Sequence, residues 1–151
     1  MKLFLIAVGN LKDKRLKSLE EDYLKRIKIP FDIIEIKALG EDLVREGQAV
    51  AKKINEISPK QRPKVILLTE NGKQLDSPSF SQWLYQNLEG SNAPVIFVLG
   101  GASGHGKNVY DLASESFSLG KLTYPHQIAR LIMVEQIYRA ETIKNNHPYH
   151  K

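Results

Sequence analysis

Short runs of apolar residues recur along the chain and predict buried strands. The first run covers residues 1–8 and is apolar at nearly every position, which is typical of a strand buried on both faces. Comparable runs follow at residues 31–36, 65–68 and 94–99, and a shorter apolar segment surrounds Phe117. The pattern therefore predicts four strands and one further short apolar segment.

Between these runs, apolar residues recur at every third or fourth position, as they do on one face of an α-helix. The predicted helices cover residues 12–27, 43–57, 77–88 and 125–144, with a short one near 108–113. Pro30 ends the first helix. Ser77 is expected to cap the third helix, with Pro78 in its first helical position.

Strands and helices alternate along the chain, and this order predicts an α/β fold: a mainly parallel sheet flanked by helices. The 151 residues are enough for one domain with its own core, and we expect a single domain over residues 1–151. In open parallel sheets, ligands bind at the carboxyl ends of the strands. The loops after Leu68, Leu99 and Phe117 are therefore the candidate ligand-binding segments.

Composition narrows the function classes only a little. The net charge of +5 is compatible with a polyanionic partner such as RNA, because neutralising phosphates releases counterions. The chain has no cysteine, which excludes disulfides, thiolate zinc sites and a cysteine nucleophile. No apolar run approaches the roughly 20 residues that cross a bilayer. We expect a cytoplasmic protein that does not interact with membranes.

A glycine-rich segment, residues 101–108, follows the fourth predicted strand and allows several interpretations. It resembles a phosphate-binding P-loop, but Asn108 stands where a serine or threonine should hold magnesium. No later strand ends in a metal-binding aspartate, and the glycine order does not fit a dinucleotide-binding loop. A structural turn remains possible. The position at a strand end favours a ligand loop that lets an adenosine moiety approach the backbone.

The helix predicted over residues 125–144 is apolar over more of its circumference than one face. Such a helix must be buried on several sides, and a homodimer contact is a natural way to bury it in a small domain. Arg130 lies on this helix, together with Glu135 and Arg139. The spacing of Glu135 and Arg139 fits a plain ion pair between successive helical turns.

The chain ends in an aromatic and basic segment, residues 145–151. His147 and His150 are too few to hold zinc, and we expect no metal site. A frayed terminus is the ordinary interpretation of such an end. The residues Tyr149, His150 and Lys151 also suit stacking on a base and contact with phosphate, and we favour this functional interpretation.

Four segments carry a specific resemblance: residues 98–101, 118–127, 135–140 and 149–151. They read Val-Leu-Gly-Gly, Ser-Leu-Gly-Lys-Leu-Thr-Tyr-Pro-His-Gln, Glu-Gln-Ile-Tyr-Arg-Ala and Tyr-His-Lys. The chain resembles the RlmH family over essentially its whole length. These are SPOUT-class enzymes that methylate N3 of a pseudouridine in large-subunit ribosomal RNA, using S-adenosylmethionine. His105 departs from the pattern, since many relatives carry a leucine there.

The resemblance implies a SPOUT-type fold with a carboxyl-terminal trefoil knot, and a homodimer whose cofactor pockets lie near the partner subunit. Its S-adenosylmethionine-binding positions fall on Leu68, Gly100, Leu119, Gly120, Lys121, Leu122, Thr123 and Tyr124. For the reaction itself, we expect His150 to handle the proton, Tyr149 to stack on or orient the base, and Arg130 to offer positive charge. The substrate would be large-subunit ribosomal RNA, either free or in the assembled ribosome.

Two other hypotheses remain open. The chain could be a non-catalytic basic factor that binds RNA or the ribosome, in which the glycine turns are only structural. That hypothesis predicts salt-dependent RNA binding without saturable binding of S-adenosylmethionine. A P-loop nucleotidase would instead require magnesium-dependent nucleotide binding that is lost on changing Lys107.

Overall fold

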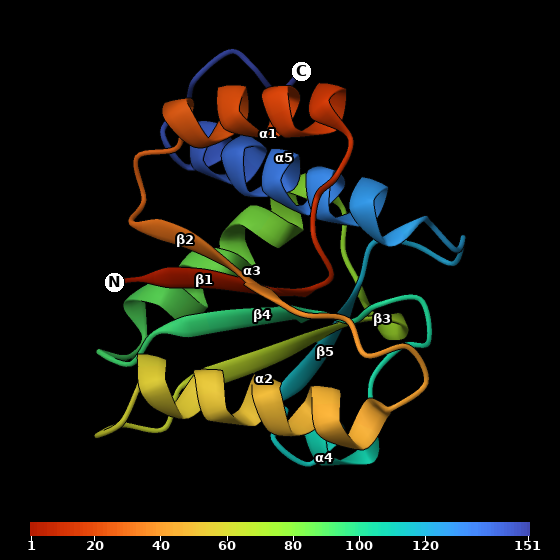
Figure 1. Ribbon diagram of the computed structural model, residues 1–151. Coiled ribbons are helices and arrows are strands. Elements are labelled where there is room, and N and C mark those ends of the chain that lie inside the picture. Colours follow the sequence, from red (N-terminus) through yellow and green to blue (C-terminus); the bar gives the residue numbers. More distant parts are fainter.

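The computed structural model describes residues 1–151 and contains one five-stranded sheet whose neighbouring strands all run parallel. The strands lie in the order β2-β1-β4-β3-β5 (Figure 1). The strands are β1 (Leu3–Val8), β2 (Phe31–Ile36), β3 (Lys64–Gln74), β4 (Val95–Leu99) and β5 (Glu115–Ser118). The helices are α1 (Lys14–Arg26), α2 (Leu43–Ile57), α3 (Ser77–Glu89), α4 (Lys107–Tyr110) and α5 (His126–Lys144). The predicted parallel sheet flanked by helices is confirmed, while the trefoil knot stays a prediction.

Alternate residues of the central strands enter two separate cores, one on each face of the sheet. On one face, Leu5 and Phe97 belong to a cluster that includes buried residues of α3 and α5. On the other face, Ile6 and Val98 pack with residues of α2 and α4. Figure 1 shows α1 and α5 on one side of the sheet and α2 and α4 on the other. The continuous apolar runs of β1 and β4 follow from this double burial.

β3 is longer than the sequence predicted and contains an irregularity. Phe117 on β5 pairs first with Leu68 and then with Lys73, so the residues between them bulge out of the register. Gly72 lies so close to β5 that a Cβ there would meet the backbone of Phe117 at 2.6 Å. Residues 70–73, in the segment expected to be a loop after Leu68, are therefore a bulged stretch of strand that is held by β5.

The first three helices begin at capping side chains, whereas α4 and α5 have no side-chain cap. Asp13 and Asp42 cap α1 and α2 by accepting hydrogen bonds from backbone N–H groups. The third helix differs from the prediction by one residue, because Asp76 rather than Ser77 is its cap. The Asp76 carboxylate accepts from the backbone N–H of Ser79 at 2.8 Å, which a serine one residue later could not do in the same geometry.

α5 packs against both α1 and α3 and is largely buried within the chain itself. Met133 and Ile137 are fully buried in the core that α3 shares. Leu131 and Ile132 remain half-buried. Much of the wide apolar surface of this helix is therefore covered without a partner, and the homodimer stays a prediction. None of the helices is both long enough and apolar enough to span a bilayer.

Candidate active site

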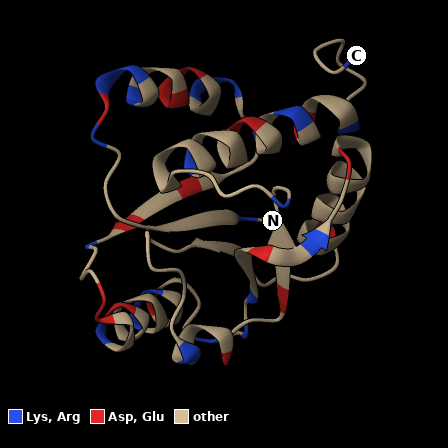
Figure 2. Cartoon of the chain, turned by 90° about the vertical axis from the view of Figure 1, so that its right-hand side faces the viewer, with Lys and Arg blue, Asp and Glu red and all other residues tan.

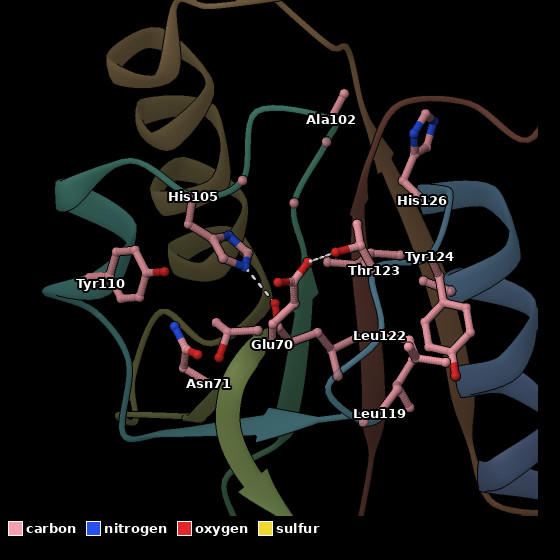
Figure 3. A pocket seen from close by; sticks show the side chains of 18 residues that line it. Glu70, Asn71, Ala102, His105, Tyr110, Leu119, Leu122, Thr123, Tyr124 and His126 are labelled. Atoms are coloured by element: carbon pink, nitrogen blue, oxygen red, sulfur yellow. Dashed lines mark hydrogen bonds between the residues drawn. The ribbon is translucent and has the colours of Figure 1, made fainter.

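A pocket of about 340 Å³ opens at the carboxyl edge of the sheet, at the ends of β4 and β5 and at the irregularity within β3. Its volume lies in the range of small-molecule sites. Residues from three segments line it, 68–71, 99–105 and 119–124, and His126 and Ala129 at the start of α5 close one side (Figure 3). The three loops singled out from the strand ends thus meet around one cavity.

Two hydrogen bonds tie the wall segments 68–71 and 119–124 together. The Thr123 hydroxyl donates to the Glu70 carboxylate at 2.6 Å, as Figure 3 shows. The Ser118 hydroxyl oxygen lies 3.1 Å from the backbone carbonyl of Glu70. Because Glu70 stands in the bulge of β3, that irregularity brings a carboxylate to the pocket wall.

The glycine-rich segment after β4 presents its backbone to the cavity. A Cβ on Gly100 would come within 2.8 Å of the carbonyl oxygen of Gly104, so a larger residue requires the backbone to move. Gly104 has a φ of +78°, in the left-handed region that favours glycine. Gly101 and Gly104 form an isolated antiparallel bridge. The result is a tight turn whose glycines bring the backbone to the pocket wall.

The same segment does not have the features of a P-loop. Lys107 is 91% exposed and pairs with Asp111 at 3.5 Å, and it does not line the pocket. α4, which Lys107 begins, is only four residues long. A P-loop lysine would instead direct its charge at phosphates held by the loop.

The segment before α5 forms the remaining wall. Gly120 has a φ of +131°, and its N–H donates to the Ser118 hydroxyl at 3.0 Å. Leu122 lines the pocket although it is 72% exposed. The wall therefore combines a constrained backbone with an exposed apolar side chain.

The cofactor-binding positions expected from the resemblance fall mostly on this one pocket. The lining includes Leu68, Gly100, Leu119, Gly120, Leu122, Thr123 and Tyr124. Lys121 does not line it; that residue is exposed and borders a neighbouring hollow together with Asn71, Gly72 and Gln74.

Several lining residues were not predicted as site residues: Glu70, Asn71, His105, Tyr110 and His126. The signal for Glu70 and Asn71 was present, because both follow a predicted strand end. His126 stands in the Pro-His-Gln stretch that carries the resemblance, immediately before the last helix. Tyr110 reaches the pocket from α4. The pattern of apolar residues gave no indication that this helix borders the pocket.

His105 occupies a defined place in the wall. Its Nε2 lies 2.9 Å from the carbonyl oxygen of Leu68, and its ring stands edge-on to that of Tyr110 with a centroid distance of 5.8 Å. Burial lowers the pKa of His105, and the hydrogen bond to Leu68 only partly opposes this effect. The ring is therefore held neutral at neutral pH.

Arg130 is placed differently from the expectation. Its guanidinium donates from Nε and Nη2 to Glu20 at 2.7 and 2.8 Å and from Nη1 to Glu35 at 3.0 Å. Burial would lower the pKa of Arg130, but the two carboxylates raise it overall. Because two carboxylates neutralise the charge, we revise its expected role from offering charge to a substrate to joining α5 with α1 and β2.

The carboxyl-terminal segment is ordered against α5. The Tyr149 hydroxyl lies 3.0 Å from the Glu135 carboxylate and 3.3 Å from the hydroxyl of Tyr23. Burial, followed by these contacts, raises the pKa of Tyr149. Arg139 contacts Glu135 at 2.6 Å, which confirms the expected ion pair between successive turns, and its Nη1 lies 3.1 Å from Nδ1 of His150.

Neither Tyr149 nor His150 lines the pocket of its own chain. Ala129 borders the pocket, whereas Arg139 contacts the end of the chain. Ten residues of α5 separate these two positions, which is about 15 Å along the helix axis. The structure therefore brings most of the expected cofactor positions together but keeps Tyr149 and His150 of the same chain apart from them.

Comparison with known proteins relates the chain to one family over its whole length. Residues 1–150 match the family described as predicted SPOUT methyltransferases. A protein of Bacteroides fragilis named Ribosomal RNA large subunit methyltransferase H is 38% identical, with 99% of both chains covered. Proteins of the same name from Acholeplasma laidlawii and Streptococcus mutans are each 39% identical, with both chains fully covered.

Proposed function

The chain belongs to the SPOUT methyltransferase family, and from this premise we propose that it methylates large-subunit ribosomal RNA with S-adenosylmethionine as the methyl donor. The observation that carries the proposal is the meeting of three strand-end loops around one pocket, in a chain whose full-length relatives are named for this activity. Following the resemblance to the RlmH family, we take the methylated atom to be N3 of a pseudouridine.

The pocket suits an adenosyl sulfonium donor. Its volume is sufficient, and glycines at Gly100 and Gly120 let a ligand approach backbone N–H and C=O groups closely. Leu68 and Leu122 provide apolar contacts on opposite segments of the wall. The Glu70 carboxylate adds a negative charge, which favours a cationic ligand.

S-adenosylmethionine supplies an electrophilic methyl group on a sulfonium centre. The residues of this chain hold the donor in position. The hydrogen bond from Thr123 to Glu70 joins two wall segments, and these segments rest on a buried sheet. Holding two reactants in line can contribute several kcal/mol to catalysis, on the order of 7–11 in favourable cases. Orientation is therefore the main contribution that this pocket can make.

The acceptor nitrogen carries a weakly acidic proton, so a group must stabilise the anion or remove the proton. Arg139 is always a donor, and its contact with His150 therefore makes Nδ1 of that ring the acceptor. In the neutral ring the proton then lies on Nε2, which can donate to an oxygen of the base. Tyr149, whose pKa is raised, stays a neutral aromatic platform for stacking.

We further propose that these residues act on the pocket of a second copy of the chain. Within one chain, the contacts of Tyr149 and His150 keep them on the far part of α5, about 15 Å along the helix from Ala129. A homodimer that places the end of one chain against the pocket of the other would bring donor and catalytic residues together. Half-buried apolar residues at Leu131 and Ile132 give such a contact an apolar centre.

Charge alone does not mark the RNA-binding face. Lys and Arg lie on α1, α2 and α5 beside acidic residues, as Figure 2 shows. The positive charges thus lie on several helices, each of which also carries acidic residues. Recognition of the RNA is therefore expected to depend on its structured surroundings, and methylation should be compared on free ribosomal RNA, isolated large subunits and assembled ribosomes.

The proposal is tested by removing residues 149–151 and measuring two properties. We expect methylation of ribosomal RNA to fall at least about a hundredfold, the usual contribution of acid–base groups. Donor affinity in a calorimetric titration should change less than about threefold, because the tail does not line the pocket. Unchanged methylation would contradict the role of the tail. Salt-dependent RNA binding without any donor binding would favour the non-catalytic RNA-binding factor.

A mixture of two inactive variants tests the homodimer arrangement. One variant lacks residues 149–151, and the other carries Gly100→Trp, which fills the pocket. Mixed dimers contain one intact pocket served by one intact tail, so we expect activity to reappear on mixing. No recovery, with mixed dimers demonstrated by mass spectrometry, would contradict action across subunits.

A further inference from the structure

The ring of His105 joins two parts of the pocket wall that come from different strands. Its Nε2 lies 2.9 Å from the carbonyl oxygen of Leu68 at the end of the regular part of β3. Its Cε1 is so close to Gly100, after β4, that a Cβ there would meet it at 3.2 Å. The ring therefore touches both strand ends that the proposed donor pocket uses.

The contacts of the ring fix its tautomer. A carbonyl oxygen only accepts hydrogen bonds, so Nε2 of the neutral ring carries the proton and donates it to Leu68. Nδ1 makes no hydrogen bond within the chain. It is also not buried, because Oδ1 of Asn108 is the one buried side-chain polar atom that lacks a partner. Nδ1 is thus an unshared acceptor with access to solvent, and it is the atom that gains a proton on acidification.

No charged side chain contacts this ring: its neighbours are the Leu68 carbonyl and the ring of Tyr110. The other titratable residues of the pocket wall are Glu70, Tyr110, Tyr124 and His126. Tyr110 presents a ring at 5.8 Å, and the Glu70 carboxylate accepts the Thr123 hydroxyl. Lys107, which begins α4, pairs in solvent with Asp111, the residue that follows this helix. Burial is the main cause that lowers the pKa of His105, with no charged partner among the causes.

We propose that His105 determines the specificity of the pocket for charged against neutral ligands: its neutral ring admits the sulfonium donor, and its protonated ring favours the demethylated product. This inference rests on the proposed function. The donor carries a sulfonium charge that the product, S-adenosylhomocysteine, lacks after the methyl group has left. Two positive charges in one pocket of this size repel each other, whereas a neutral thioether is indifferent to the ring charge.

Two substitutions separate the charge of the ring from its hydrogen bond. His105→Gln keeps an N–H donor for the Leu68 carbonyl but does not titrate. His105→Leu removes both properties. His126→Gln is the matched control, because His126 is the other histidine that lines the pocket. If His126 were the source of a pH effect, this third substitution would remove it.

The test is a calorimetric titration of the full chain with S-adenosylmethionine and with S-adenosylhomocysteine, at about pH 7.5 and about pH 5.5. For the unsubstituted chain and for His126→Gln, we expect donor affinity relative to product affinity to fall severalfold, but less than tenfold, at the lower pH, because the lowered pKa of His105 leaves part of the rings neutral there. For His105→Gln and His105→Leu, the ratio should stay constant. By reciprocity, NMR should show that the donor lowers the pKa of His105 more than the product does.

Circular dichroism at both pH values shows whether each variant is still folded, so that unfolding is not mistaken for a loss of ligand binding. A histidine whose pKa is lowered in the fold contributes stability above its unfolded value of about 6.5, and this stability is lost as the pH falls through that range. The lower pH is therefore chosen within the folded range of each variant.

Three results would overturn the inference: an affinity ratio that does not change with pH, a change that persists in His105→Gln, or a change that disappears in His126→Gln. In each case, the proposed function would still be supported as long as the unsubstituted chain binds the donor. If neither ligand binds the unsubstituted chain at any pH, the proposed donor pocket is wrong, and the inference that rests on it is wrong as well.

Discussion

Replacing Arg130 with methionine is expected to destabilise the fold rather than to interfere directly with the pocket. The side chains of Arg130 and Glu20 are only 7% and 5% exposed, and two hydrogen bonds join them. Methionine fills a similar space without charge. The carboxylate of Glu20 then stays buried with no cation beside it, whereas Glu35, at 39% exposed, can be hydrated.

The magnitude follows from this difference in burial. Removing one partner of a buried ion pair typically costs about 3–5 kcal/mol, because the remaining charge is uncompensated. For a chain of this length, about 2–4 °C of Tm corresponds to each kcal/mol. We therefore expect Arg130→Met to lower the Tm by roughly 6–20 °C. A typical domain stability of about 5–15 kcal/mol leaves the variant folded at low temperature.

Thermal and urea unfolding followed by circular dichroism measure this effect. Arg45→Met is the control, since Arg45 is 70% exposed and lies 3.8 Å from Asp42. Exposed pairs of this kind contribute about 1 kcal/mol or less. Adding Glu20→Gln to Arg130→Met removes the buried charge and should restore part of the lost stability.

Activity measurements complete the test. Donor affinity, measured where Arg130→Met is folded, should stay within about threefold of the original value, because Arg130 does not line the pocket. A variant whose Tm stays within about 2 °C of the original and which has lost methylation would refute this reasoning. Such a result would return Arg130 to the chemistry of the reaction.

Two further predictions concern the pocket wall. Gly100→Ala places a Cβ 2.8 Å from the Gly104 carbonyl oxygen, whereas a Cβ at Gly101 would be 3.4 Å from its nearest atom, in Val8. We therefore expect Gly100→Ala to weaken donor binding about tenfold, measured by calorimetry, and Gly101→Ala to weaken it less. Thr123→Val removes the hydroxyl bonded to Glu70 and should weaken donor binding about three- to tenfold, with recovery in Thr123→Ser. Equal affinities for Thr123→Val and Thr123→Ser would show that this bond does not hold the wall in place.

The sheet could be predicted because its central strands are buried on both faces, which requires the continuous apolar runs seen at residues 3–8 and 95–99. The second half of β3 could not be predicted in the same way. Residues 69–74 are mostly polar and exposed, and backbone pairing with β5 rather than side-chain burial makes them a strand. Such pairing depends on a segment more than 40 residues later in the chain.

The site was predictable to the extent that strand ends determine it. The rule that ligands bind at the carboxyl edge of a parallel sheet identified the three wall segments. This rule could not identify His105 as a residue of the pocket wall, because the direction of that side chain depends on the turn formed by Gly100 and Gly104. Nor could it place Arg130, whose carboxylate partners Glu20 and Glu35 lie 110 and 95 positions earlier.

α5 connects the stability of the fold with the geometry of the pocket. Its first residues close the pocket, and its middle is held by the ion pair of Arg130 with Glu20. Near its end, the buried Glu141 carboxylate accepts hydrogen bonds from the backbone N–H groups of Lys28 and Ile29 at 2.8–3.0 Å. Because two separate anchors fix the helix, loss of one should lower stability more than it displaces the wall segment that precedes α5. This is the physical reason to expect a large change in Tm and a small change in donor affinity from the same substitution at Arg130.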